Sequence, residues 1–346
     1  MNARVRDSFH VQAGHCEALG SPFTARLLRL LADGLMPDGA VAARVLDWPG
    51  DPDGKADALA LRLAGGLHHL AREGIDPDLA AVYSAPPDDD AALLAPVLAA
   101  LHRHEAALLR WLDSAPQTNE VLRSVALIAA GHWLAARTGL PMVLSELGAS
   151  AGLNLIWDHH ALVAGGRRFG PAEATVTLCP EWSGPLPPDA PPRIAARAGV
   201  DLNPVDPLRD RGRLLAYVWA DQADRIARTE AALDLAARLR PEIAQADAID
   251  WLAGRLAQPH PGHLHLVFHT VAWQYFPAAA RQRGEALLTE AGARATDEAP
   301  LARLAMEADG ETPGAGLALT LWPGGQTTRL GRVDFHGRWV DWQAQG

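Results

Sequence analysis

The chain of 346 residues contains little cysteine and almost no lysine. Its two cysteines, Cys16 and Cys179, are too few for a disulfide framework or a cysteine-based zinc site, so we expect a reducing, cytoplasmic compartment. Lys55 is the only lysine, and its neighbours are the Asp, Pro and Gly residues typical of a loop. This excludes a phosphate-binding loop that ends in Lys-Ser or Lys-Thr, and it argues against a buried lysine Schiff base.

An excess of positive charge and long apolar runs are also missing. The formal net charge is -10, whereas a protein that coats nucleic-acid phosphates needs a basic face. No apolar run approaches the ~18 residues that span a bilayer, and the N-terminal residues lack the apolar core of a signal peptide. We therefore expect a soluble protein that acts on a small molecule, with no nucleic-acid or membrane partner. The sequence leaves the oligomeric state open.

Residues 1–138 predict an all-helical N-terminal domain. Apolar residues recur there at steps of three and four, which is the spacing of an amphipathic helix. The pair Ser21-Pro22 is typical of a helix start. The expected helical segments are 8–33, with this new start inside it, 58–72, 91–112 and 118–138.

Residues 139–346 predict an α/β domain, because short apolar runs alternate with helical segments. This alternation favours a mostly parallel, Rossmann-like sheet that is covered on both faces. Pro323-Gly324-Gly325 supplies the turn of an antiparallel hairpin near the C-terminus, and residues 162–196 are interpreted as an irregular insertion. The expected strands are 142–147, 175–178, 197–202, 242–246, 263–270, 301–306, 317–322 and 327–335, and the expected helices are 152–160, 214–239 and 278–291.

The segment that runs from Glu146 to Asn154 carries the strongest functional signal. An apolar strand ends there in an acidic residue, a tight turn with Gly148 and Gly152 follows, and a helix is expected next. Such a turn leaves backbone N–H groups free at a helix N-terminus, and its glycines let a ligand approach the main chain. Nucleotide-like cofactors bind at such turns, at the carboxyl ends of strands in open α/β sheets.

Glu146-x-Gly148-x-x-x-Gly152 resembles the first motif of class I S-adenosylmethionine-dependent methyltransferases, and the resemblance covers roughly residues 141–340. It implies that this turn holds the methionine part of the cofactor, that Asp201 binds the ribose hydroxyls, and that Asp247 reads the adenine amino group. Three departures stand out. Ser150 replaces the usual central glycine, about fifty residues separate Glu146 from Asp201 where about twenty are usual, and the helix before the last strands is reduced to residues 309–316.

Four further residues complete the cofactor set that this resemblance implies, and several members of the whole set have a simpler alternative. The segment Asp201 to Pro204 is also typical of an Asx turn, and Asp247 is also a suitable N-cap for the following helix. Asn154 either reaches the ligand or is merely exposed in a first helical turn. The four residues are Ser150, Asn154, Asn203 and Ala248.

The segment from His269 to Tyr275 is the candidate for the substrate side and for catalysis. A histidine at a strand end can accept a proton near neutral pH, so His269 is predicted to be the base or an orienting group. Trp273 and Tyr275 suit a sulfonium by cation–π attraction of ~0.5–2 kcal/mol. The alternative is that the aromatic rings belong to the core and that His269 is a satisfied polar group. The predicted substrate-side residues are Gln117, Asn119, Glu120, Trp273 and Gln274, of which the first three also suit simple helix capping.

The whole chain resembles, more closely, a bacterial family of unknown function, domain-of-unknown-function family 2332. No established activity comes with that resemblance. The phrases that carry it are Gln117-Thr118-Asn119-Glu120, Glu146 through Asn154, Gly199 through Pro204, Asp247-Ala248, His269 through Tyr275 and Trp322 through Gly325.

Two other functions stay open beside methyl transfer to a small or medium acceptor. Gly148-x-Ser150-x-Gly152 matches the nucleophile elbow of α/β-hydrolases, and Asp247 and then His269 or His336 follow in that family's order. A protein of this fold can also bind a nucleoside without turnover. The run of histidines between 260 and 269 suggests a metal, but the His-Glu-x-x-His signature is absent, so no metal is expected.

Overall fold

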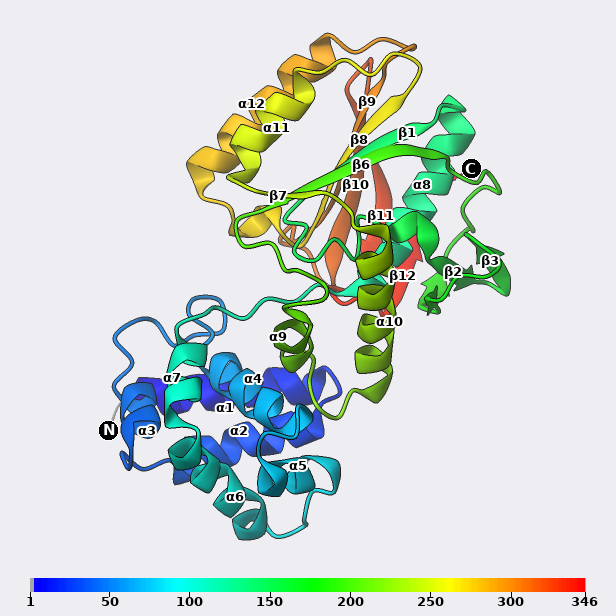
Figure 1. Ribbon diagram of the computed structural model, residues 1–346. Coiled ribbons are helices and arrows are strands. Elements are labelled where there is room, and N and C mark those ends of the chain that lie inside the picture. The colour runs from blue at the N-terminus through cyan, green and yellow to red at the C-terminus, as the bar shows by residue number, and fades with distance from the viewer. Residues whose placement is uncertain (1–2, 346) are drawn as a thin grey trace. The chain divides into compact units, whose positions relative to one another are not determined.

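The computed structural model describes residues 3–345, and contacts divide the chain into two compact units. The helical unit comprises Met1–Thr118 with Arg209–Glu230, and the sheet unit comprises Asn119–Leu208 with Ala231–Gly346. Figure 1 shows the blue and cyan helices of the first unit and the strands of the second. The mixed α/β class predicted from the sequence is confirmed, with helices at the N-terminus and a large, mostly parallel sheet after them.

The helical unit forms where apolar residues recur at helical spacing, and Leu27, Leu28, Leu63 and Leu67 are fully buried in its core. The expected helix start at Ser21-Pro22 is confirmed. The unit's helices are α1 (Ala3–Ala18), α2 (Pro22–Gly34), α3 (Ala40–Leu46), α4 (Leu59–Arg72), α5 (Pro77–Ser84), α6 (Asp90–Arg103), α7 (Glu105–Leu112), α9 (Arg211–Ala216) and the start of α10 (Ala223–Leu239).

Two expected helices are each broken in two. The segment 91–112 forms α6 and α7, bent by 89°, and the segment 214–239 forms α9 and α10. The first break has a clear anchor, because the buried carboxylate of Asp76 accepts hydrogen bonds from Arg103 and His104 at the bend. Among residues 3–345, no single helix has the length and apolarity to cross a membrane, and only this bent pair passes that test jointly.

The sheet unit is built on nine strands in the order β5-β12-β11-β10-β9-β8-β1-β6-β7. Neighbouring strands from β9 to β7 are parallel. From β9 to β12 each strand is antiparallel to the next, as expected for the C-terminal hairpin, and β5 pairs with β12 in parallel. The bounds are β1 (Met142–Leu147), β5 (Glu181–Ser183), β6 (Ile194–Asp201), β7 (Ile243–Gln245), β8 (Leu264–Thr270), β9 (Leu301–Glu307), β10 (Ala315–Trp322), β11 (Gln326–Val333) and β12 (Trp339–Trp342).

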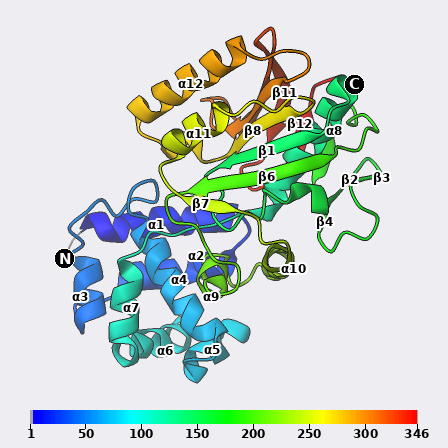
Figure 2. The ribbon, with the colours of Figure 1, turned by 45° about the horizontal axis from the view of Figure 1, so that its top comes forward.

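The central strands β1 and β8 are buried along their whole length, as strands with both faces covered must be. In both ribbon views α11 (Ala248–Leu256) and α12 (Ala278–Ala293) run along one side of the sheet, and α8 (Ser124–Thr138) lies on the other (Figure 1, Figure 2). The chain moves from β1 outward to β6 and β7, then returns to β8 and β9 on the other side of β1. Ligands bind at such a reversal, beyond the carboxyl ends of the strands.

The insertion between β1 and β6 contains a small sheet of its own, in the order β3-β2-β4. Its strands are β2 (Ala161–Ala164), β3 (Arg167–Phe169) and β4 (Thr177–Leu178), and the last of these lies within the expected strand 175–178.

The expected helix at residues 152–160 is wrong. The amides of Leu155, Trp157 and His159 donate to carbonyls three residues earlier rather than four, and only the short 3-10 helix η2 (Trp157–His159) forms. Leu153 through Trp157 are all buried, so no exposed face remains for an amphipathic helix.

Replacing glycine by alanine is predicted to have opposite effects on the free energy of unfolding at two helical positions of the sheet unit. A Cβ on Gly131 in α8 would lie 2.4 Å from the ring of Trp157, whereas a Cβ on Gly254 in α11 meets nothing within 4 Å. Gly131→Ala is therefore expected to lower the free energy of unfolding by ~1–3 kcal/mol through overpacking. Gly254→Ala is expected to raise it by ~0.5–1 kcal/mol through helix propensity. Urea denaturation of both variants tests this, and equal effects would contradict the packing argument.

Candidate functional site

Strand β1 ends in a turn that uses left-handed backbone three times. Gly148 and Gly152 have φ of 73° and 72°, and Ser150 between them has φ of 51°. A positive φ is uncommon for a residue with a Cβ, and such strain collects at functional sites. The amides of Gly148 and Ala149 both donate to the carbonyl of Val200. These bonds hold the turn against the end of β6.

Both glycines of this turn are required by internal packing. A Cβ on Gly148 would lie 2.6 Å from the Cβ of Ala272, and one on Gly152 would lie 2.8 Å from Cδ1 of Ile243. Real Cβ atoms essentially never come so close to another atom. The space beside these glycines is thus filled by β7 and by the loop after β8, and the turn donates most of its amides to the protein itself.

The segment before α8 packs directly on this turn. The side chain of Asn119 accepts a hydrogen bond from the amide of Leu153 (3.0 Å), and the carbonyl of Glu120 accepts one from Asn154 Nδ2 (3.2 Å). Asn154 is 1% exposed, and its Oδ1 accepts from the Ser124 hydroxyl (2.8 Å). Three residues predicted for the site (Asn119, Glu120 and Asn154) are therefore brought together, and Asn154 is buried rather than exposed.

Asp201 links the turn after β1 to the loop after β6. Its Oδ2 accepts from the amide of Ser150 at 2.8 Å, and its Oδ1 accepts from the amide of Asn203 at 2.9 Å. The second bond is the Asx turn that the sequence analysis left as an alternative. Asp201 thus lies beside the glycine turn as predicted, with both carboxylate oxygens already in use.

Asp247 follows β7 at the same edge of the sheet and begins α11. Its Oδ1 accepts from the amides of Ile249 (2.9 Å) and Asp250 (3.0 Å), so the N-cap interpretation is confirmed. Ala248 is the first residue of that helix and is half-buried. The proposed contact of Asp247 with an adenine stays a prediction.

Glu146 is the most unusual residue of the site. It is 2% exposed, and its Oε2 has no hydrogen-bond partner among the described residues. The Ser150 hydroxyl is likewise buried without a partner. Burial raises the pKa of Glu146 well above its usual range, the charge of Asp201 adds to the rise, and Arg123 opposes it. Unpaired buried polar groups are rare and require an explanation, and a bound ligand is one.

Arg123 is a site residue that the sequence analysis missed. It ends the short 3-10 helix η1 (Val121–Arg123), and it donates to the carbonyls of Phe335 (2.9 Å) and Thr270 (3.1 Å). It therefore ties the loop after β11 to the end of β8. Its position directly after Asn119-Glu120 was the signal that could have found it.

His269 is the last residue but one of β8 and is fully buried, with both ring nitrogens engaged in hydrogen bonds. Arg303 Nε donates to its Nε2 (3.1 Å), so the proton lies on Nδ1, which donates to Glu307 (2.7 Å). Burial lowers the pKa of His269, and the bond to Glu307 only partly opposes this. His269 is therefore neutral and oriented. A role as a free base would require one of these bonds to break.

Glu307, also missed from the sequence, organises the loop after β8. Its Oε1 accepts from the amides of Ala272 and Trp273 (both 3.0 Å), and its Oε2 from that of Gln274 (3.3 Å). Burial opposes ionisation of Glu307, but these bonds and the one from His269 outweigh it, so its pKa lies below the usual value. Val271 in the same loop has φ of 52°, an outlier for a β-branched residue.

The remaining predicted residues lie in different environments. Trp273 is buried and stacks on His269 at 5.0 Å between ring centroids, so the core alternative describes it. Gln274 accepts from the amide of Ala308, and Tyr275 is 66% exposed. Gln117 belongs to the helical unit.

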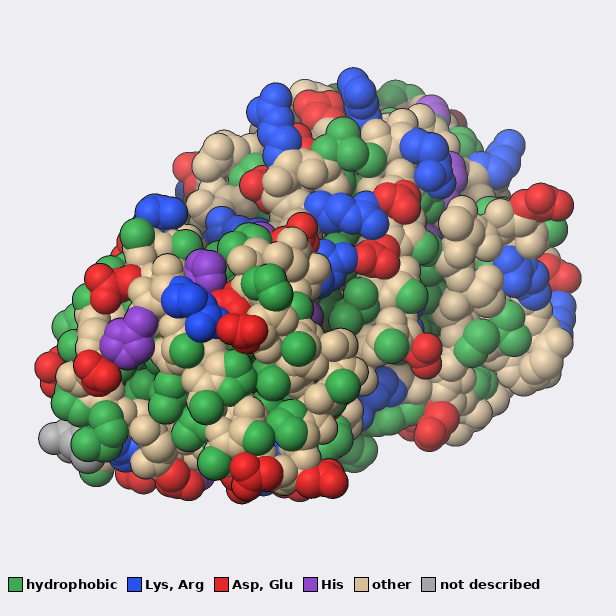
Figure 3. All heavy atoms as spheres, turned by 60° about the horizontal axis from the view of Figure 1, so that its bottom comes forward, with side chains coloured by type: hydrophobic (Ala, Val, Ile, Leu, Met, Phe, Trp, Pro, Cys, Tyr) green, Lys and Arg blue, Asp and Glu red, His purple; other side chains and the backbone are tan. Residues whose placement is uncertain are grey.

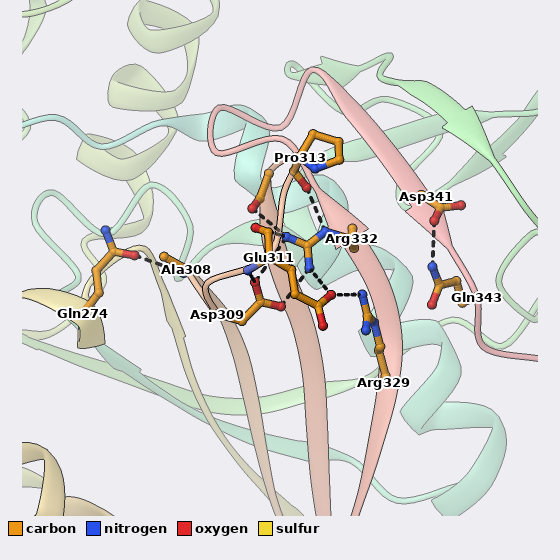
Figure 4. Close-up of polar contacts among 10 residues, drawn as sticks. Gln274, Ala308, Asp309, Glu311, Pro313, Arg329, Arg332, Asp341 and Gln343 are labelled. Carbon is orange, nitrogen blue, oxygen red and sulfur yellow. Dashed lines mark hydrogen bonds and ion pairs between the residues drawn. The ribbon is translucent and has the colours of Figure 1, made fainter.

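A buried arginine fixes the loop that follows β9 (Figure 4). Arg332 on β11 donates to both oxygens of Asp309, to the carboxylate and carbonyl of Glu311, and to the carbonyls of Pro313 and Gly314. Hydrogen bonds from Arg332 lower the pKa of Asp309. This loop begins at Ala308, the partner of Gln274, so the cluster supports the edge of the site from one side.

Among residues 3–345, no group of three or more His, Cys, Asp or Glu side chains is arranged to hold a metal ion.

Over residues 6–342 the chain matches the family described as an uncharacterized protein conserved in bacteria (DUF2332). The chain belongs to this family. No curated protein and no solved structure matches it. The family membership predicted from the sequence is thus confirmed over nearly the whole length.

The buried Glu146 carboxyl predicts a pH-dependent gain in stability on substitution. The folded state holds the Glu146 proton more tightly than the unfolded state, so this contribution is lost as pH rises through the raised pKa. Glu146→Gln keeps the shape without the charge. We expect it to raise the free energy of unfolding by ~1–3 kcal/mol at about pH 8 and by much less at about pH 5, measured with urea. The exposed Glu173 supplies the control, Glu173→Gln. A gain that does not change with pH would contradict the burial of an uncharged carboxyl.

Proposed function

We propose that this protein is an S-adenosylmethionine-dependent methyltransferase that acts on a small or medium acceptor. The observation that supports this most is the parallel order β7-β6-β1-β8-β9, with an acidic residue at the carboxyl end of three of these strands. Glu146 is the last residue but one of β1, Asp201 is the last residue of β6, and Asp247 lies just after β7. Acidic residues at these strand ends suit the hydroxyl and amino groups of an adenosyl cofactor.

The unpaired polar atoms beside the turn fit such a cofactor. Within residues 3–345, Glu146 Oε2 and Ser150 Oγ are both buried without partners, and a ligand with hydrogen-bonding groups would satisfy them. Asp201 is half-buried and already holds the backbone of Ser150. In the proposed complex, Asp201 accepts from the ribose hydroxyls and Asp247 from the adenine amino group. When bound, the cofactor supplies an electrophilic methyl group on a positively charged sulfur.

The protein's own part in the reaction is mainly to hold the reactants in line, which can account for most of the acceleration of such a transfer. We assign His269 an orienting role, since Arg303 and Glu307 already occupy its two nitrogens. In the loop after β8 the side chain of Trp273 is buried, and the exposed Tyr275 is left to contact the acceptor. The proton released by the acceptor then goes to solvent or to a group on the acceptor side.

The serine hydrolase alternative has one observation in its favour. Ser150 has the strained φ of 51° and a buried, unpartnered hydroxyl, and a strained backbone is typical of a nucleophile elbow. Against it, no α-helix follows the turn, and His269 is engaged with Glu307 and Arg303. Labelling by a fluorophosphonate probe that is lost in Ser150→Ala would favour the hydrolase.

Charge and cysteine chemistry support a small-molecule role in the cytoplasm. On the face shown in Figure 3, acidic, basic and hydrophobic side chains are intermingled, and the chain as a whole carries a net charge of -10. Both cysteines are free, and Cys179 is exposed, which suits a reducing compartment. We therefore propose a small-molecule acceptor rather than a nucleic acid.

Calorimetric titration with S-adenosylhomocysteine tests the proposal. We expect saturable binding that weakens at least tenfold in Asp201→Ala, because a carboxylate hydrogen bond to a ligand contributes ~1.5–3 kcal/mol. Asp206→Ala is the matched control, since Asp206 forms the same kind of Asx turn in the same loop with the amide of Leu208. No heat and no thermal shift at millimolar ligand with the folded protein would refute cofactor binding. Binding without methyl transfer to any acceptor would leave a nucleoside-binding protein.

A further inference from the structure

A cavity of about 300 Å³ opens at the ends of the strands opposite to those that form the candidate site. It lies between the two loops that lead from α11 into β8 and from α12 into β9, at the amino ends of these strands. Ligand sites of doubly wound sheets lie at the carboxyl ends, so the fold alone does not account for this cavity. Its lining residues are Leu256, Ala257, Gln258, Pro259, His260, His263, His265, Ala291, Arg294, Ala295, Ala299, Pro300 and Leu301.

The lining of this cavity differs in charge from the rest of the chain. It contains one arginine, Arg294, and three histidines, and it contains no aspartate or glutamate, although the chain has 41 acidic residues against 31 basic ones. Arg294 is paired with Glu290 in a pair that is more than half exposed, and such pairs are weak. The guanidinium is therefore free to exchange this partner for a ligand.

A chain of hydrogen bonds through Ser145 holds the buried ring of His265 in place. Arg255 Nε donates to the Ser145 hydroxyl (3.0 Å), and that hydroxyl is hydrogen-bonded to His265 Nε2 (2.9 Å). Burial, followed by the charges of His260 and Arg255, lowers the pKa of His265 to about 3. His265 is therefore neutral, and Ser145 connects it to a permanently charged arginine.

The ring of His260 lies beside that of His265 and has one nitrogen whose hydrogen bonding is unsatisfied. This ring meets the ring of His265 edge-on at 4.8 Å, and its Nε2 is buried with no hydrogen-bond partner in the part of the chain that the structure describes. Burial and then the charge of Arg255 lower the pKa of His260. The charges of Arg255 and of Arg294 in the lining make the local potential positive, which favours a negatively charged ligand.

We propose that this cavity binds a small oxyanion, a carboxylate or a phosphate, through His260 and Arg294. The positive surroundings attract the anion, and its oxygen accepts a hydrogen bond from the otherwise unpaired Nε2 of His260. The site is separate from the proposed cofactor site, so the inference does not depend on methyl transfer.

Titration of the intact protein with inorganic phosphate and with acetate, followed by the NMR signals of the histidine rings, tests the proposal. Ionic strength is held constant with chloride. We expect at least one of the two anions to give saturable shifts of the His260 and His263 signals with one shared dissociation constant. The signals are assigned from their loss in His260→Phe and His263→Phe. If neither anion gives a saturable change, or if chloride alone reproduces the shifts, the proposal is overturned.

Two variants and one control make the result specific. His260→Phe keeps the ring and removes its nitrogens, and it is expected to weaken binding at least tenfold. Arg294→Gln, a surface change that does not threaten the fold, is expected to weaken it several-fold. His102→Phe, at an exposed histidine of the helical unit, should leave the dissociation constant unchanged. Unaltered binding in Arg294→Gln, or in a folded His260→Phe protein, would refute the assigned contacts.

Discussion

The conformation of the loops at the carboxyl ends of the strands depends on the contacts of the Glu307 carboxylate. This carboxylate accepts hydrogen bonds from Nδ1 of His269 and from the backbone amides of Ala272, Trp273 and Gln274. These three amides belong to the loop after β8. These bonds hold that loop in a conformation that places Val271 in the left-handed region and sets Ala272 against Gly148. The loop after β8 and its contact with the turn after β1 therefore both depend on one carboxylate, and this carboxylate belongs to the neighbouring strand β9.

The acids at the ends of β1 and β6 show how environment gives one chemical group two roles. Asp201 accepts two backbone amides and connects the turn after β1 with the loop after β6. Glu146, buried without a partner for Oε2, is driven toward its uncharged form. An uncharged carboxyl can donate as well as accept. The site thus contains one acid that acts as a structural acceptor and one that remains available as a hydrogen-bond donor.

The sequence predicted correctly the elements that depend on residues close together along the chain. The apolar runs of β1 and β8, the hairpin turn at Pro323-Gly324-Gly325 and the helix start at Pro22 are where the sequence indicated. The helix expected after Gly152 failed, because the amide of Leu153 bonds to Asn119 and the segment is buried on all sides. Glu307 and Arg123 escaped notice for a related reason. Their partners are far away along the chain, and no spacing rule reports a contact that only the folded sheet creates.

The hydrogen bonds of Arg332 affect how the loop after β9 resists thiols and alkali. Its guanidinium joins the segment from Asp309 to Gly314 to β11 through six hydrogen bonds, while both cysteines of the chain are free. An arginine side chain does not lose its charge in the physiological range and has no redox chemistry. These hydrogen bonds therefore hold the segment to β11 by a link that thiols do not reduce and that mild alkali does not discharge.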